Sequence, residues 1–235
     1  MTALVSAIPV VARQTGRPVV LVGGLAVLCR LPSAYRATTD LDTVDRLGEG
    51  QVAQLELLVA AGARPSGPSG AVIETPFGSV QVDVLQVTDA DVAHLPSDET
   101  DRLHVLAHDW AAATATPVVV AADGLDPVEV TVAEPGALVA MKLQSAMNRG
   151  AAKEGTDLLD IVRISLDREC GPTSRAQLEL AGAQLRADAL LHARRWFDEA
   201  ADRSLRIIRR VPEGSEVELD DLHLVGELLA SALET

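Results

Sequence analysis

The segment from residue 19 to residue 44 constrains the fold more than any other part of the sequence. An apolar run, Val19–Val22, ends at two consecutive glycines, Gly23 and Gly24, and a short apolar segment follows them. Glycine lets a backbone approach a phosphate closely, and a helix N-terminus behind it favours an anion. The segment therefore predicts a strand, a phosphate-cradling turn at Gly23 and Gly24, and a helix within an α/β layer.

Two carboxylates, Asp40 and Asp42, follow in a run that is typical of a strand over residues 39–44. Because side chains alternate along a strand, both carboxylates point to one face, with their Cα atoms about 7 Å apart. Mg²⁺ prefers one or two carboxylates together with substrate phosphates. The pair therefore predicts a magnesium site that is completed by the phosphates of a substrate.

This arrangement resembles the nucleotidyltransferase superfamily, whose first motif is Gly-Gly or Gly-Ser followed by Asp-x-Asp. It is more similar to the AbiEii/AbiGii-type (MenT-like) toxin nucleotidyltransferases, in which an arginine and a small hydroxylic residue precede Asp-Leu-Asp, as Arg36, Thr38 and Thr39 do here. By this resemblance Arg36 binds phosphate or the acceptor and Thr39 hydrogen-bonds a phosphate. A solvated loop arginine and a threonine that simply favours a strand are the open alternatives.

Asp83 is the expected third carboxylate of a two-metal site. In its strand, expected over Ser79–Val87, Val80, Val82 and Val84 lie on one face, while Gln81, Asp83 and Leu85 lie on the other. The superfamily places its third acid on the next strand, so the resemblance implies that Asp40, Asp42 and Asp83 share the metals. An ordinary solvated aspartate on a half-exposed strand is the alternative.

A second set of charges lies in the C-terminal half. The chain's two lysines, Lys142 and Lys153, are both there, and the toxin family has a similar element that Arg149 and Asp157 also match. The resemblance implies that Lys142 contacts the triphosphate and that Lys153 and Asp157 belong to the nucleotide site, with Asp157 orienting Lys142 or reaching the site itself. Chance placement of the lysines, and a first-turn acid favoured by the helix dipole, are the alternatives. Thr156 stands where the family usually has an aromatic residue.

The chain divides into an expected nucleotidyltransferase core, residues 1–133, and a helical domain, residues 134–235, that completes the nucleotide or acceptor site. The expected strands are Pro18–Val22, Thr39–Val44, Ala71–Thr75, Ser79–Val87 and Pro117–Ala122. The expected helices are Leu25–Leu31, Gln51–Ala61, Asp98–Ala113, Pro135–Asn148, Thr156–Leu166, Leu219–Leu233 and a broken run over Ser174–Arg210, and Arg64–Gly70 is expected to be a loop. The predicted fold class is thus α/β, a polymerase-beta-like mixed-sheet core followed by a C-terminal helical bundle.

Composition limits the partners and the cellular compartment that we expect for this protein. The formal net charge is −14, which disfavours indiscriminate nucleic-acid binding, and no apolar run reaches the roughly 18 residues of a membrane span. Only Cys29 and Cys170 are present, which favours reduced thiols and a cytoplasmic protein without a membrane partner. A basic stripe at Arg203, Arg206 and Arg210 is either an RNA-binding surface or a solvated helix face.

Together these features predict an Mg²⁺-dependent nucleotidyltransferase with a two-metal site. It is expected to move a nucleoside monophosphate from a nucleoside triphosphate (NTP) to an acceptor hydroxyl, releasing pyrophosphate. By resemblance the acceptor is the 3′ end of a tRNA and the protein is a toxin of a bacterial toxin–antitoxin system, restrained by a cognate antitoxin protein. The alternatives are an aminoglycoside-type nucleotidyltransferase with a small-molecule acceptor and a non-catalytic binding partner of the same fold.

Overall fold

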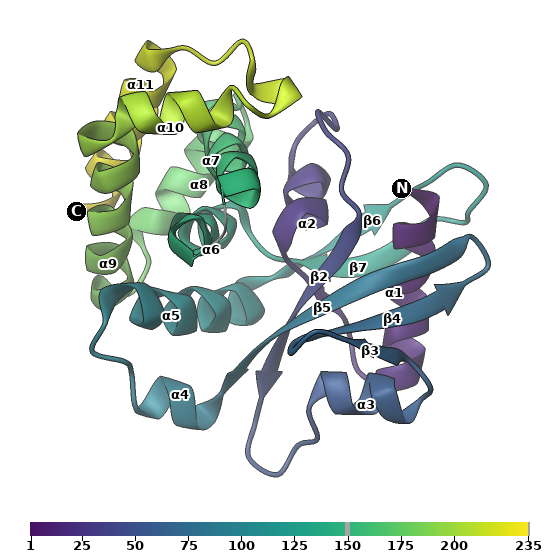
Figure 1. Ribbon diagram of the computed structural model, residues 1–235. Coiled ribbons are helices and arrows are strands. Elements are labelled where there is room, and N and C mark those ends of the chain that lie inside the picture. Colours follow the sequence, from purple (N-terminus) through teal and green to yellow (C-terminus); the bar gives the residue numbers. More distant parts are fainter. Residues whose placement is uncertain (149–150, 235) are drawn as a thin grey trace. The chain divides into compact units, whose positions relative to one another are not determined.

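The structure is a computed structural model that describes residues 1–148 and 151–234. The chain forms two compact units (Figure 1). The sheet unit comprises Met1–His94 and His108–Glu134, and the helical unit comprises Leu95–Ala107 and the chain from Pro135 onward. A mixed α/β architecture with C-terminal helices is therefore confirmed.

A seven-stranded mixed sheet forms the centre of the sheet unit, in the order β3-β4-β5-β2-β1-β7-β6. The strands are β1 (Val20–Leu21), β2 (Asp40–Leu47), β3 (Arg64–Ser66), β4 (Gly70–Thr75), β5 (Gly78–Thr88), β6 (Thr116–Val120) and β7 (Val128–Val132). β2 pairs in parallel with β5, and β1 pairs in parallel with β7. The remaining neighbours are antiparallel, and β4 and β5 form the hairpin expected from their sequence.

Helix α1 (Thr2–Thr15) packs against the sheet and supplies much of the core of this unit. Its apolar residues recur at helical spacing, with Leu4, Ile8 and Val11 buried, and it ends at Gly16 in the left-handed conformation. The other helices of this unit are α2 (Gly23–Arg30), α3 (Gln54–Ala60) and α4 (Asp89–Ala93). Helix α5 (Glu99–Thr114) runs through the boundary, since its residues up to Ala107 belong to the helical unit.

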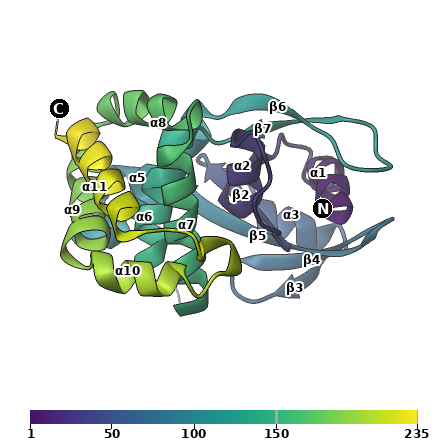
Figure 2. The same cartoon turned by 90° about the horizontal axis from the view of Figure 1, so that it is seen from above.

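In the helical unit, α6 packs against α7, α8 and α9, and α11 contacts the same three helices (Figure 2). The elements are α6 (Pro135–Asn148), α7 (Ala151–Leu166), α8 (Cys170–Glu179), α9 (Ala183–Arg194), the π-helical turn η1 (Arg195–Glu199), α10 (Ala201–Ile208), the 3₁₀ turn η2 (Pro212–Gly214) and α11 (Leu219–Leu233). Nowhere in the described ranges is a helix both long and apolar enough to cross a membrane.

Several element predictions are confirmed and others need correction. Helices α6 and α11 have the predicted bounds. The expected loop at Arg64–Gly70 contains β3, which tolerates Pro65 because it is an edge strand. Helix α7 begins before Thr156, which therefore lies inside the helix and does not cap it. Helix α10 ends at Ile208, so Arg210 does not share a helical face with Arg203 and Arg206 as expected.

Candidate active site

The sheet brings Asp40, Asp42 and Asp83 together. Asp42 on β2 is the register partner of Asp83 on β5, and Asp40 is the partner of Gln81. Neighbouring strands lie about 4.8 Å apart, and parallel register partners project from the same face. All three carboxylates are half-buried, whereas Leu41 and Val82 beside them are fully buried on the opposite face. The predicted acids therefore form one cluster on the more open face of the sheet.

Gly23 lies directly against the carboxylate of Asp42. Its φ is +65°, and a Cβ at this position would lie 2.0 Å from Asp42 Oδ2. The backbone N–H of Val22 donates to the carbonyl oxygen of Asp42 over 3.0 Å, which fixes the turn against β2. Only glycine suits this position, because it tolerates the left-handed backbone and has no Cβ to collide with Asp42. The first residue of α2 is thus shaped around a carboxylate of the cluster.

Gly24 provides similar room for two of the polar residues that precede β2. A Cβ there would lie 2.8 Å from Arg36 Nη2 and 2.9 Å from Thr38 Oγ1. A guanidinium and a hydroxyl therefore gather beside the N-terminal turn of α2, whose N–H groups carry partial positive charge. Thr39 is exposed, and its hydroxyl donates to Asp40 Oδ1 over 3.0 Å. Arg36 and Thr38, more than Thr39, are placed to meet an anion at this helix end.

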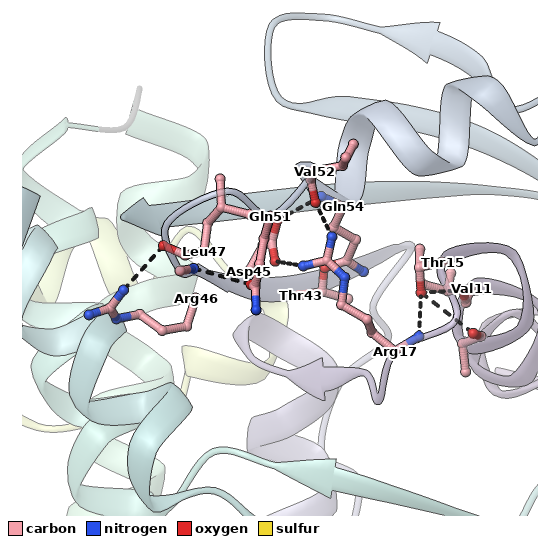
Figure 3. Close-up of polar contacts among 12 residues, drawn as sticks. Val11, Thr15, Arg17, Thr43, Asp45, Arg46, Leu47, Gln51, Val52 and Gln54 are labelled. Atoms are coloured by element: carbon pink, nitrogen blue, oxygen red, sulfur yellow. Dashed lines mark hydrogen bonds and ion pairs between the residues drawn. The ribbon is translucent and has the colours of Figure 1, made fainter. Parts of the chain in front are cut away.

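The other end of β2 is fixed by a buried polar network that the sequence did not reveal (Figure 3). Asp45 is buried, accepts a hydrogen bond from the backbone N–H of Gln54 at 2.6 Å and pairs with Arg17 Nη1 at 3.2 Å. Thr43 Oγ1 lies 3.4 Å from the carbonyl oxygen of Asp83 and 3.4 Å from Gln54 Oε1. The Asp45 contacts tie β2 to Arg17 and Gln54, and the Thr43 contact joins β2 to β5 at Asp83.

Asp83 has a neighbour that sequence reasoning also missed. The side-chain amide of Gln81, two residues earlier on β5, donates to Asp83 Oδ1 over 2.7 Å. Gly70 on β4 is the register partner of Asp83 on its other side. The only sequence signal for Gln81 was its position two residues from Asp83, which places both side chains on one face.

The donor set of the cluster fits Mg²⁺. Three carboxylates stand on the adjacent strands β2 and β5, and the carboxylate of Asp42 occupies the space that a side chain at position 23 would fill. Across residues 1–148 and 151–234, no group of three or more His, Cys, Asp or Glu side chains is placed so that it could hold a metal ion. Mg²⁺ is commonly held by one or two carboxylates and completed by water and substrate phosphates, so the cluster suits a metal that arrives with a nucleotide.

In the helical unit, Lys142 forms a buried charge cluster. Its Nζ lies 2.6 Å from Asp157 Oδ1 and 2.8 Å from Asp160 Oδ2, and Ser145 Oγ donates to Asp157 Oδ2 over 2.8 Å. Burial lowers the pKa of Lys142, but attraction to Asp157 and Asp160 outweighs it, so the pKa is raised overall. Lys142 and Ser145 share a face of α6, and within this unit the ammonium of Lys142 bridges α6 to α7.

The other predicted basic residues of this unit are more open. Lys153 is exposed near the start of α7, and Arg149 lies outside the described residues. Arg203 is 52% exposed, pairs with the buried Glu154 at 2.8 Å and has its guanidinium 5.3 Å from the ring centroid of Trp196. Arg206 is also exposed. Arg203 therefore stabilises this unit through Glu154 and Trp196, while about half of its side chain is exposed to solvent.

Comparison with known proteins gives little further information. No protein family profile matches the chain, and no curated protein matches it. Among solved structures, it is similar to an antigenic nucleotidyltransferase-like protein from Paracoccidioides brasiliensis, with 17% identity and a TM-score of 0.45, over 80% of this chain and 92% of that one. A match this distant assigns neither family nor activity to the chain, so both depend on the residues described above.

Proposed function

We propose that this protein is an Mg²⁺-dependent nucleotidyltransferase that moves a nucleoside monophosphate from an NTP to an acceptor hydroxyl. The observation that carries the proposal is the pairing of Asp42 with Asp83 across two parallel strands, with Asp40 on the same face and Gly23 shaped around Asp42. Three half-buried carboxylates on one face repel one another, and a bound cation would relieve that repulsion.

Each candidate site residue of the sheet unit has a distinct role in this proposal. Asp40 and Asp42 hold the metals that come with the triphosphate, and Asp83 shares a metal and faces the acceptor hydroxyl. When bound, Mg²⁺ neutralises charge on the attacking and leaving oxygens of an in-line displacement. Gly23 and Gly24 let phosphate oxygens approach the backbone N–H groups of α2, and Arg36 with Thr38 contacts the same anion.

The nucleotide-binding roles of Lys142, Lys153 and Asp157 remain predictions from the family resemblance. For Lys142 a direct phosphate contact requires its ammonium to be shared with, or released by, the carboxylates of Asp157 and Asp160. The alternative is that Lys142 acts only by holding α6 against α7. Replacing it with arginine separates charge from geometry, because the planar fork cannot occupy the space of an ammonium between two carboxylates.

The acceptor is proposed to be the 3′ end of a tRNA, and the biological role that of a toxin restrained by an antitoxin protein in the cytoplasm. This finer proposal is supported by the motif resemblance and by the exposed Arg203 and Arg206. The net charge of −14 favours a second candidate, a cationic small molecule such as an aminoglycoside. The presence of all three acids argues against a non-catalytic partner protein.

The test is transfer of label from each α-labelled NTP, with Mg²⁺, to total RNA or to an aminoglycoside. We expect Asp42→Asn to lower transfer about 10²- to 10³-fold, because loss of one metal ligand removes several kcal/mol of transition-state stabilisation. The matched control is Asp126→Asn, since Asp126 is an exposed aspartate of the same unit. Retention of transfer by the Asp42 variant would overturn the proposed function, whereas labelling of the aminoglycoside alone would replace the tRNA acceptor.

A further inference from the structure

Gln81 lies on β5, two residues before Asp83. Its register partner on β2 is Asp40, and its own side chain donates to Asp83 Oδ1 over 2.7 Å. A neutral amide donor differs from a lysine or arginine here, because it fixes the carboxylate without cancelling its charge. Gln81 therefore orients an acid of the cluster and leaves its negative charge available to a cation.

Gly70 supplies the space in which this contact forms. A Cβ on Gly70 would lie 2.3 Å from Gln81 Nε2 and 2.6 Å from Asp83 Oδ1, closer than real Cβ atoms approach. It would also lie 2.6 Å from the carbonyl oxygen of Ser66, so the backbone gives no room on that side. The amide of Gln81 and the carboxylate of Asp83 thus occupy the space where a side chain of residue 70 would lie. If residue 70 carried a side chain, both Gln81 and Asp83 would have to move.

We propose that Gln81 is a positioning residue for the nucleotidyltransferase reaction, and that Gly70 is the space it requires. The amide holds Oδ1 of Asp83 so that Oδ2 is presented to the metal and the acceptor hydroxyl. The inference rests on the proposed function, because it concerns the same acids. A purely structural hydrogen bond between two residues of β5 is the competing explanation.

The test compares Gln81→Met, which keeps length and loses the donor, with Gln86→Met on the same strand. Gln86 is exposed, which makes it a matched control. With Mn²⁺ as the probe and a non-hydrolysable NTP analogue present at saturation, electron paramagnetic resonance measures the Mn²⁺ bound to each variant. We expect Gln81→Met to weaken Mn²⁺ binding about 3- to 10-fold and to lower kcat about 10- to 100-fold, with the KM for the NTP changed less than about 3-fold. Gln86→Met should match the wild type in all three.

A double-substitution cycle distinguishes positioning from a structural role. If Gln81 acts only through Asp83, adding Gln81→Met to Asp83→Asn weakens Mn²⁺ binding and kcat no further. Equal losses in both backgrounds, or Mn²⁺ binding by Gln81→Met equal to that of Gln86→Met, would overturn the inference. A wild-type protein that shows the expected Mn²⁺ pattern but transfers no nucleotide would refute the proposed function and leave the positioning role in place.

Discussion

Substitution of Gly23 tests whether the position of the Asp42 carboxylate matters for catalysis. Gly16 is a suitable control, because it has the same backbone conformation but no atoms close to where a Cβ would be. Gly23 has φ +65° with Asp42 Oδ2 only 2.0 Å from a built Cβ, and Gly16 has φ +66° with nothing within 4 Å. Replacing either residue with alanine carries the same left-handed backbone cost, roughly 1–2 kcal/mol. For a chain of this length that corresponds to a fall in Tm of about 2–8 °C for Gly16→Ala, and the clash with Asp42 adds to this fall for Gly23→Ala.

The two variants should differ in activity. A Cβ on residue 23 forces the carboxylate of Asp42 to move by about 1 Å or more, since contacts below 3.0 Å are not tolerated. A displacement of this size in a catalytic group costs about 10²-fold in rate. We therefore expect Gly23→Ala to lose about 100-fold in nucleotide transfer and Gly16→Ala to stay within about 2-fold.

Differential scanning fluorimetry gives Tm, and transfer of labelled NTP gives the rate, on the same preparations. A large difference in rate between two variants that are both folded at the assay temperature would support the assignment of Asp42. If Gly23→Ala transfers nucleotide as fast as Gly16→Ala, the position of the Asp42 carboxylate is irrelevant to catalysis and the reasoning fails. If Gly16→Ala loses the same activity, the effect of Gly23→Ala reflects backbone strain alone.

Two further predictions concern the buried Lys142 and the partly buried Cys29. Lys142→Ala should lower the free energy of unfolding by about 3–5 kcal/mol in urea titrations, because Asp157 and Asp160 lose their cation, and an unchanged urea midpoint would contradict this. Since the pKa of Lys142 is raised above its ordinary value of 10.5, the difference between wild type and this variant should persist at lower pH and decline only as the pH rises past 10.5 towards the folded-state pKa. Partial burial raises the pKa of Cys29 to about 11, and the charge of Arg30 opposes this shift. Cys29 should therefore react slowly with a disulfide reagent at pH 8 until the protein is unfolded, and rapid labelling of the native protein would refute the raised pKa.

Local patterns in the sequence predicted most of the elements and the faces of the acids. The alternation around Asp40, Asp42 and Asp83 is a property of a single strand, so it could be recognised without knowing any neighbour. Helices α6 and α11 were predicted with their observed bounds because Pro135 marks one start and helical apolar spacing marks the other. Helix α1 was missed because a proline at position 9 obscured it, and strand β7 was missed although Val128, Val130 and Val132 alternate with polar residues.

The contacts that complete the candidate site could not be predicted in the same way. The pairing of Asp42 with Asp83 depends on a parallel register between two strands that are separated in the chain by α3, β3 and β4, and no local pattern specifies a register. Gln81 and Gly70 acquire their roles only through that register. The burial of Lys142 was hidden for a related reason, because its carboxylate partners lie 15 and 18 residues further along the chain.

The central position of β2 in the sheet affects how readily this strand opens locally in the native protein. Three strands flank it on either side, so fraying from β3 or β6 must pass through two more strands before it reaches Asp42. Local opening concentrates where few contacts hold the backbone, and the backbone amides of β2 should therefore be among the slowest in the sheet unit to exchange with deuterium. Asp40 and Asp42 thus stand on the segment of the sheet unit that should open least.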